Sequence, residues 1–280
     1  MQIFSEARLQ VLGKALKQRS LSRTQRGSSQ HGHAVNVERR GSPRRSLASR
    51  SLALSYMAAH PEPALQRPEV LARGPWPLER VSVRWSEQCY EPPPAHAAEA
   101  DAAIAALQQR GSPSHDGMAG RLLSYREQDG GIEIEMQPVR WALRLVGGDA
   151  SCSMAALCVT RDADGRWLAG RRAPWVASWA GRWALGAGGS VDLGESPART
   201  LVRELEEEWS VAPSRVQAEA LVALPHRMVM FIGQAWLPTG AEVTPDHEHD
   251  AHAWWPAEID EWPAEAGDSL PLVARWLSAP

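Results

Sequence analysis

Four glutamates and an arginine lie close together between residues 203 and 208, in the stretch "RELEEE" that follows the glycine-rich "GAGG". On a helix, Glu204, Glu207 and Glu208 share one face, whereas Glu206 points elsewhere. Three converging carboxylates raise one another's pKa unless a cation neutralises them. Because Mg²⁺ and Mn²⁺ prefer such oxygen ligands, the spacing predicts a divalent metal site. The alternative is a solvated acidic surface helix.

The residues around this cluster predict the helix that carries it. Ser196 is a suitable N-cap, and Pro197 suits the first helical position, where its missing N–H costs nothing. The helix is expected to end at about Trp209. Arg203 precedes Glu207 by four residues and could orient its carboxylate. The apolar face that would pack on a core consists of Ala198, Leu201, Val202, Leu205 and Trp209.

The whole segment from Gly189 to Val211 resembles the Nudix box, G x5 E x7 REUxEExGU, where U is an apolar residue. The positions that match are Gly189, Glu195, Arg203, Glu204, Leu205, Glu207, Glu208 and Val211. One position departs, since Ser210 stands where the family usually has glycine and often needs a left-handed backbone. Before the box, Gly186 stands where many members carry proline.

The resemblance implies metal-dependent hydrolysis of a diphosphate linkage in a nucleoside diphosphate derivative, with Mg²⁺ or Mn²⁺ as cofactor. It assigns Glu204 as a ligand or the general base, with Arg203 positioning Glu204 or Glu207. Glu195 would be structural. The implied metal ligands are Glu204, Glu207, Glu208, the main-chain carbonyl of Gly188 and Glu248, which stands six residues before Trp254.

Substrate contacts are harder to derive, and we expect them at Arg172, Trp183 and Arg227. The tryptophans Trp175, Trp179 and Trp183 recur every four residues, which suits local packing or, as the alternative, base stacking. Arg227 follows His226 between two expected strands, where a turn is the plainer interpretation. The histidines and aspartates between residues 246 and 252 fit no standard zinc pattern, so we interpret them as a solvated loop.

Two segments of different character are expected to position these residues. Residues 75–147 predict a small α+β module with a strand at 80–85, a helix at 95–111 and a hairpin turning at Gly130–Gly131. A linker at 147–151 follows. Residues 151–280 predict an α/β fold, a Nudix-like α/β/α sandwich with a mixed sheet. Its expected elements are strands at 154–160, 166–172, 219–224, 227–237 and 252–256 and a last helix at 269–277.

The first 74 residues are rich in Arg, Ser, Gln and Pro and show no sustained hydrophobic period, which predicts a disordered basic tail. Three alternatives stay open for this tail: a contact with nucleic acid, an organellar transit peptide, or a natural start at Met57.

The composition excludes several classes of protein. The chain has 280 residues, a net charge of −3 and three cysteines without a CxxC pair, which predicts a cytoplasmic protein without a disulfide framework. No apolar stretch is long enough to predict a membrane span. We expect a small nucleotide-type molecule as partner and leave a homodimer open. One alternative function is a non-catalytic nucleotide sensor. An isopentenyl diphosphate isomerase is disfavoured, because those enzymes place a cysteine near the position of Ala187.

Overall fold

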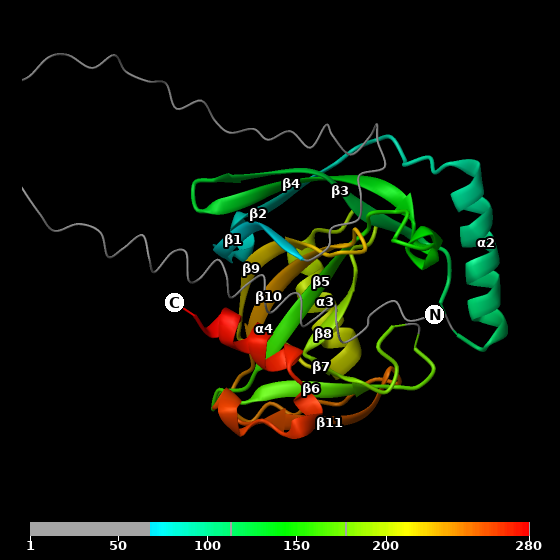
Figure 1. Ribbon diagram of the computed structural model, residues 1–280. Helices are drawn as coiled ribbons and strands as arrows, with labels where there is room; N and C mark the ends of the chain where they lie inside the picture. Colours follow the sequence, from blue (N-terminus) through cyan, green and yellow to red (C-terminus); the bar gives the residue numbers. More distant parts are fainter. Residues whose placement is uncertain (1–67, 113, 177, 280) are drawn as a thin grey trace, which may run out of the picture.

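The computed structural model describes residues 68–112, 114–176 and 178–279 (Figure 1). Its main sheet has the strand order β1-β9-β10-β5-β6-β11, with β7 paired to β6 and β8 paired to β5. The sheet is mixed, because β10 and β5 run parallel and the other pairs run antiparallel. The strands are β1 (Glu69–Pro77), β5 (Met154–Arg161), β6 (Trp167–Arg172), β7 (Trp183–Leu185), β8 (Ala187–Ser190), β9 (Arg215–Ala223), β10 (Val229–Trp236) and β11 (His249–Trp255).

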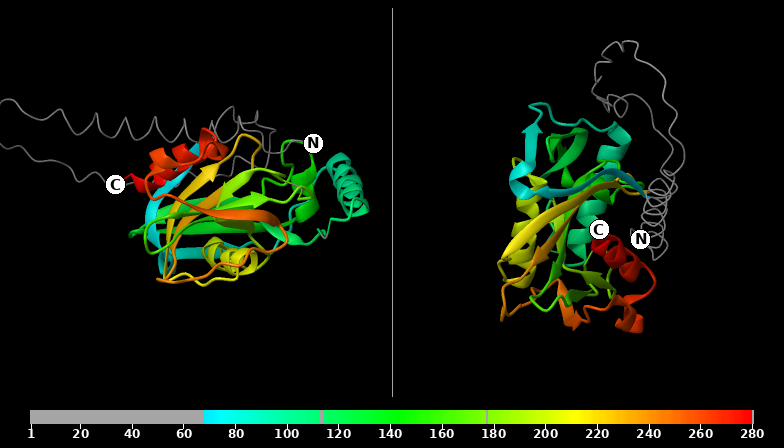
Figure 2. Two further views of the ribbon diagram at one scale, coloured as in Figure 1. Left: turned by 90° about the horizontal axis from the view of Figure 1, so that it is seen from below. Right: turned by 90° about the vertical axis from the view of Figure 1, so that its left-hand side faces the viewer.

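Helices cover both faces of this sheet, α3 (Pro197–Trp209) on one face and α4 (Ser269–Ser278) on the other (Figure 2). Central strand β5 shows how the sequence produces the two layers. Met154 and Ala156 pack in the core with α3, whereas Ala155 and Val159 pack in the core with α4. Alternate side chains of a strand point to opposite faces, so a strand buried on both faces must be apolar throughout. The predicted α/β/α sandwich is confirmed.

A second sheet has three strands in the order β2 (Val81–Trp85), β4 (Gly131–Arg140) and β3 (Met118–Gln128). The predicted hairpin is present, and its turn residues Asp129 and Gly130 have φ values of 48° and 72°. Helix α2 (Pro94–Gln109) packs on the 3-10 helix η3 (Trp141–Leu145). The remaining 3-10 turns are η2 (Leu78–Arg80), η4 (Ile259–Glu261) and η5 (Ala264–Ala266).

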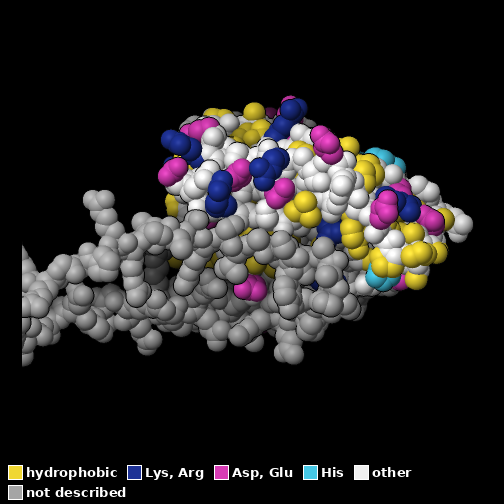
Figure 3. All heavy atoms as spheres, turned by 90° about the horizontal axis from the view of Figure 1, so that it is seen from above, with side chains coloured by type: hydrophobic (Ala, Val, Ile, Leu, Met, Phe, Trp, Pro, Cys, Tyr) yellow, Lys and Arg dark blue, Asp and Glu magenta, His cyan; other side chains and the backbone are white. Residues whose placement is uncertain are grey.

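The three-stranded sheet is not packed as a separate body. Ile134 and Met136 of β4 lie in the same core cluster as Met154 of β5 and Leu201 of α3. Acidic and basic side chains are interspersed on the face seen in Figure 3. The ion pair between Arg126 and Glu133 joins β3 to β4 at 2.5 Å. The apolar side of this sheet therefore faces the main core.

The predicted boundaries around this part differ from the structure. The expected end of the tail at residue 74 falls inside β1, which begins at Glu69 and pairs with β9 along Glu69–Pro77. The expected linker at 147–151 is partly internal, since Asp149 is 3% and Ser151 0% exposed. The sequence rules missed the start of β1 because its pairing with β9 is interrupted by two register shifts. They missed the burial of the polar turn because that burial depends on its surroundings. The predictions for residues 1–67 lie outside the described residues.

Helix α3 begins and ends as predicted. The N–H of Arg199 donates to Ser196 Oγ at 3.2 Å, which is the expected N-cap. Ser210 follows the helix at φ 52° and ψ 36°, so the left-handed exit is kept without glycine. Among the described residues, no helix has the length and apolarity to cross a membrane.

Candidate active site

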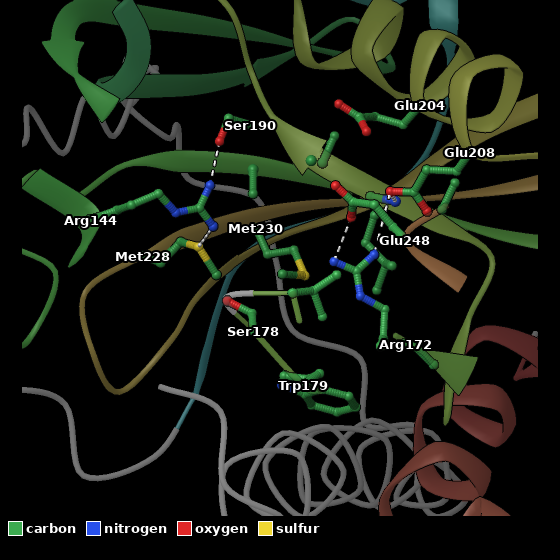
Figure 4. A pocket seen from close by; sticks show the side chains of 18 of the residues that line it. Arg144, Arg172, Ser178, Trp179, Ser190, Glu204, Glu208, Met228, Met230 and Glu248 are labelled. Carbon is green, nitrogen blue, oxygen red and sulfur yellow. Dashed lines mark hydrogen bonds and ion pairs between the residues drawn. The ribbon is translucent and has the colours of Figure 1, made fainter. Parts of the chain in front are cut away.

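A cavity of about 510 Å³ lies between α3, the sheet and η3. Its lining comes from the segment between α2 and β3, from η3, from β5 to β8 and the segment between β6 and β7, from α3, from β10 and the turn before it, from the start of β11 and from α4. Figure 4 shows the residues that face it, with acidic side chains on one side and Arg144 on the other. The core of the fold therefore leaves a space with glutamates at one end and Arg144 at the other.

Three glutamates form one end of the cavity, which we call the carboxylate wall: Glu204, Glu208 and Glu248. Glu204 and Glu208 lie one helical turn apart on α3 and are only 8% and 5% exposed. Glu248 reaches the same place from the residue before β11. Glu207, by contrast, keeps 59% of its side chain exposed at the edge of the helix. The predicted face therefore divides into two buried acids and one exposed acid, and Glu206 is exposed as expected.

The surroundings of the two buried acids favour their protonated forms. Burial, opposed by Arg203, raises the pKa of Glu204 to about 7. Burial also raises the pKa of Glu208 well above its ordinary value, and the charges of Glu204 and Glu248 add to the effect. Arg172 opposes it. Such a pair is expensive to ionise without nearby positive charge.

Two arginines supply positive charge to the carboxylate wall. Arg172 Nη2 lies 2.8 Å from Glu248 Oε2, and its Nη1 lies 3.8 Å from Glu208 Oε1. Arg203 Nη1 lies 2.8 Å from Glu204 Oε1 and 2.8 Å from Glu207 Oε2. Each acid of the wall is thus within ion-pair distance of a guanidinium.

Arg203 is held in place from its other side. Its Nε donates to Glu195 Oε1 at 3.0 Å, and its Nη2 donates to the carbonyl of Ser190 at 3.1 Å. Burial would raise the pKa of Glu195, but hydrogen bonds from Arg203 and Thr200 lower it below its ordinary value. An ionised Glu195 fixes Arg203, which in turn orients the acids of α3. The prediction that Glu195 is structural agrees with these contacts.

Glycines allow β8 to approach the carboxylate wall. The N–H of Gly188 donates to Glu208 Oε1 at 3.3 Å, and Gly188 lines the cavity. A side chain at Gly189 would meet the carboxylate of Glu204. Gly186 has φ 64°, and a side chain there would meet the backbone of Cys158, so this position needs glycine.

The donor set of the wall fits a hard divalent cation. Within the described residues, no three His, Cys, Asp or Glu side chains are arranged to hold an ion directly. The guanidinium groups of Arg172 and Arg203 provide the positive charge in this arrangement. The acids are nevertheless buried, mutually repelling and oxygen-only, and the glycine at position 189 leaves room for the Glu204 carboxylate. These are properties that Mg²⁺ or Mn²⁺ sites share.

The opposite end of the cavity carries a residue that the sequence did not single out. Arg144 of η3 lines the cavity, and its Nη1 donates to Ser190 Oγ. Trp141 Nε1 donates to the same oxygen at 3.1 Å. In the sequence, Arg144 is a lone cation in the apolar run "WALRLV", and nothing in that run shows that it faces a site 60 residues further along the chain.

The predicted substrate contacts are placed differently. Arg172 lines the cavity, as do Trp175 and Trp179, but Trp183 and Arg227 are not part of the described lining. Trp183 packs on Trp255, with ring centroids 5.5 Å apart, so local packing explains it. Arg227 lies in the turn between β9 and β10 at φ 74°, which is the plainer interpretation given above.

The interpretation of residues 246–252 as a solvated loop is wrong for His249. This residue begins β11, is 7% exposed and lies with its ring 4.6 Å from that of Trp209. Its Nε2 is 3.8 Å from Glu208 Oε2, and burial lowers its pKa. Strict alternation along "HDAHAWW" would put His249 on the same face as Trp255, but a register shift between His249 and Ala251 turns it to the other face, against Trp209. His247 and His252 are exposed as expected.

Comparison with known proteins identifies the region that holds the carboxylate wall. Residues 153–272 match the family model of the NUDIX domain. The search of curated proteins returned no match.

Several solved structures resemble a part of the chain. The MutT protein from Methanosarcina mazei Go1 is 20% identical with a TM-score of 0.34, over 45% of this chain and 90% of that one. A C. elegans Ap4A hydrolase is 20% identical with a TM-score of 0.34, over 44% and 98%. The NUDIX domain of Shewanella oneidensis NrtR, complexed with ADP ribose, is 17% identical with a TM-score of 0.33, over 45% and 88%.

Proposed function

We propose, from the membership of residues 153–272 in the NUDIX family, that this protein hydrolyses a diphosphate linkage in a nucleoside diphosphate derivative with the help of a divalent metal ion. The family supports pyrophosphohydrolase chemistry, and its hydrolases generally use divalent metals. The observation that carries the proposal is the buried pair Glu204 and Glu208, which meets Glu248 at one end of a cavity large enough for a nucleotide.

Mg²⁺ or Mn²⁺ would be held by Glu204, Glu208 and Glu248, with the Gly188 carbonyl and Glu207 completing the set. When bound, the ion would neutralise phosphate charge and lower the pKa of a water molecule. Hydrolysis of a phosphoric anhydride needs this charge neutralisation and an aligned water more than it needs covalent catalysis. The chain's own residues then have to orient the acids and accept a proton.

Glu204 is suited to accept that proton if it is not itself a ligand. Its pKa of about 7 is close to neutral pH, where a general base is most effective. Arg203 holds the Glu204 carboxylate at 2.8 Å and is itself fixed by Glu195. Arg203 is therefore a positioning residue, and His249 behind Glu208 restricts where that carboxylate can move.

The mouth of the cavity favours a substrate with a flat ring. Trp175 is 40% exposed, lines the cavity and stacks on His247 with ring centroids 5.2 Å apart. Exposed aromatic faces bind bases by stacking without reading their identity. This supports the nucleotide class and leaves the base unspecified.

A hydrolysis screen tests the proposal. The full chain would be incubated with nucleoside triphosphates, dinucleoside polyphosphates, ADP-ribose, NADH, nucleotide sugars and isopentenyl diphosphate, with Mg²⁺, Mn²⁺ or a chelator. We expect hydrolysis of at least one compound, abolished by the chelator. The Glu208→Gln variant should lose at least about a hundredfold in rate, since it removes a charged ligand.

Glu206→Gln is the matched control on the same helix, because Glu206 is exposed and faces away from the cavity. Its rate should stay within about threefold of the wild type, as expected for a surface substitution. If the wild-type protein binds a nucleotide tightly but hydrolyses none of the compounds, the hydrolase hypothesis is wrong and the nucleotide-sensor hypothesis takes its place. Conversion of isopentenyl diphosphate to an isomer would support the third alternative.

A further inference from the structure

Arg144 lies outside the NUDIX match and still lines the cavity. It belongs to η3, which follows the three-stranded sheet, so it comes from the part of the chain that precedes the NUDIX domain. Its position is fixed by neutral groups. Nη1 donates to Ser190 Oγ, and Nη2 lies 3.7 Å from the sulfur of Met228. The guanidinium carbon is 5.4 Å from the ring centroid of Trp141.

Arg144 has no carboxylate at ion-pair distance in the part of the chain that the structure describes. Asp149 is buried, which raises its pKa and favours the neutral carboxyl, and its oxygens accept from the hydroxyls of Ser151 and Ser153. Burial lowers the pKa of Arg144 below its ordinary value. A partly buried guanidinium that meets only neutral partners is poorly compensated, and it gains most from an anion that enters the cavity.

The arrangement of charge in the cavity says where that anion would lie. Figure 4 shows Arg144 on the side opposite Glu208, Glu248 and Arg172, with Met228 next to it and Met230 in the space between. An anion held by metal at the carboxylate wall cannot satisfy Arg144 as well unless it extends across the cavity. A chain of phosphates has this shape, and a guanidinium forms paired hydrogen bonds to phosphate oxygens.

We propose that Arg144 binds a phosphate group of the substrate at the end of the cavity opposite the carboxylate wall. It is a specificity-determining residue supplied by the segment before the NUDIX domain. The inference rests on the proposed hydrolysis for its substrate, and it adds that the substrate carries phosphate beyond the group held at the carboxylate wall. The segment before the NUDIX domain thereby contributes a substrate contact to the site, in addition to the side chains that it contributes to the shared core.

The test measures binding and catalysis separately. Binding of inorganic pyrophosphate with Mg²⁺ would be measured by calorimetry, and KM and kcat would be measured for the substrate found in the screen. In Arg144→Gln, we expect pyrophosphate binding to weaken and KM to rise about tenfold to a hundredfold, the size expected for one charged hydrogen-bonded contact. The value of kcat should change less than about threefold, because the acids that act on the bond are untouched.

Three further variants separate binding from a structural role. Arg140→Gln is the matched control, since Arg140 is close in sequence but pairs with Asp101 and Asp116 outside the cavity. It should leave KM unchanged. Arg144→Lys keeps the charge and should recover part of the affinity, and it replaces Arg144→Gln if that variant does not fold. Ser190→Ala removes the acceptor of Arg144 and keeps the guanidinium, so its KM should stay well below that of Arg144→Gln.

The outcomes are distinct for the two proposals. If the wild type hydrolyses a substrate and Arg144→Gln has the same KM and pyrophosphate affinity, the role of Arg144 is refuted and hydrolysis stands. If Ser190→Ala reproduces every effect of Arg144→Gln, or if pyrophosphate does not bind the wild type, the role is also refuted. If nothing is hydrolysed but pyrophosphate binding depends on Arg144, the phosphate site stands and the hydrolase does not.

Discussion

The two ends of the cavity differ in how their charges are balanced. At the carboxylate wall, Glu204 lies 2.8 Å from Arg203, and Glu248 lies 2.8 Å from Arg172. At the other end, Arg144 meets a hydroxyl and a sulfur. The glutamates are stabilised by arginines, and a metal ion could replace those arginines as their partner. Arg144 contacts only neutral groups, so an anion in the cavity would stabilise its charge.

This difference also separates two parts of the chain. The carboxylate wall comes from the NUDIX domain, and Arg144 comes from the residues before it. The two parts are joined by the shared core around Ile134 and Leu201 and by the contacts of Trp141 and Arg144 with Ser190. A site with both ends therefore requires that the two parts fold together.

The largest effect is expected from a truncated side chain in the hydrophobic core that the two parts of the chain share. Ile134 of β4 is 0% exposed and lies in the core cluster that also holds Leu201 of α3. Ile134→Ala should lower the free energy of unfolding by about 2–5 kcal/mol, because a cavity remains where the side chain was. Urea unfolding, followed by circular dichroism and by tryptophan fluorescence, measures this.

Both signals should shift together in that experiment, as they would for one cooperative unit. Leu193→Ala is the control, because Leu193 is 52% exposed, and it should change stability by less than about 0.5 kcal/mol. Two separate transitions, with only one of them moved by Ile134→Ala, would mean that the ends of the cavity belong to independent domains.

The second effect concerns how Arg203 orients the glutamates of the carboxylate wall. Arg203 contacts Glu195, Glu204 and the Ser190 carbonyl through different nitrogens, and a lysine has a single ammonium. We expect Arg203→Lys to lower kcat about thirtyfold, since the acids would lose their orientation while the net charge is kept. Steady-state kinetics with the screened substrate measures it.

Arg199→Lys is the matched control for that prediction. Arg199 lies on the same helix with its side chain 81% exposed and its Nε 3.7 Å from Glu195. Its kcat should stay within about twofold, as expected for an exposed ion pair. An equal loss of kcat in both variants would contradict this role, because the orientation of the glutamates would then not depend on the separate contacts of the Arg203 guanidinium.

The sequence predicted this end of the cavity well because its geometry is local. The helix from Pro197 to Trp209 and its N-cap follow from patterns within a few turns, whereas the burial of Glu204 and Glu208 does not. The exposure of Glu207 did not follow, because the i, i+3 and i+4 rule places residues on a face but does not say where that face meets the cavity.

The other end of the cavity depends on contacts between residues that are far apart in the sequence. The position of Arg144 beside Ser190 follows from how the three-stranded sheet packs on the main sheet, and no local pattern encodes that packing. The start of β1 at Glu69 and the burial of His249 escaped for the same reason. Alternation within one strand says which residues share a face, but the partner of that face is set by the tertiary fold.

A smaller effect is expected from adding a side chain at position 189, next to the carboxylate wall. A methyl group at position 189 would meet the Glu204 carboxylate, which can swing aside because it ends a flexible side chain. Gly189→Ala should therefore lower kcat/KM about tenfold through displaced geometry while the melting temperature changes little. Kinetics and thermal unfolding of the same preparation test both halves of this expectation.

Gly147→Ala provides the comparison, because a side chain there would meet nothing within 4 Å. Its activity and its melting temperature should both match the wild type. If Gly189→Ala unfolds at a much lower temperature, then the strand β8 and not the carboxylate has moved, and Glu204 is held more rigidly than its contacts indicate.

The smallest effect concerns Asp149, a buried acid that follows η3 and lines the cavity. Asp149 is 3% exposed, and burial raises its pKa even though Ser151, Arg144 and Ser153 oppose the shift. The folded protein thus keeps a proton on Asp149 at pH values where the unfolded chain has released it. Since the folded state then binds more protons, the free energy of unfolding falls as the pH rises from the ordinary aspartate value through the raised one.

Asp149→Asn removes this titration and keeps an amide of the same shape. Between about pH 4 and pH 8, its unfolding free energy should fall less than that of the wild type, by about 1.4 kcal/mol for each unit by which the pKa is raised. Urea unfolding at a series of pH values measures the two slopes. A steeper fall in the variant would mean that Asp149 is ionised in the folded state and already serves as the anion for Arg144, and the two ends of the cavity would then be balanced in the same way.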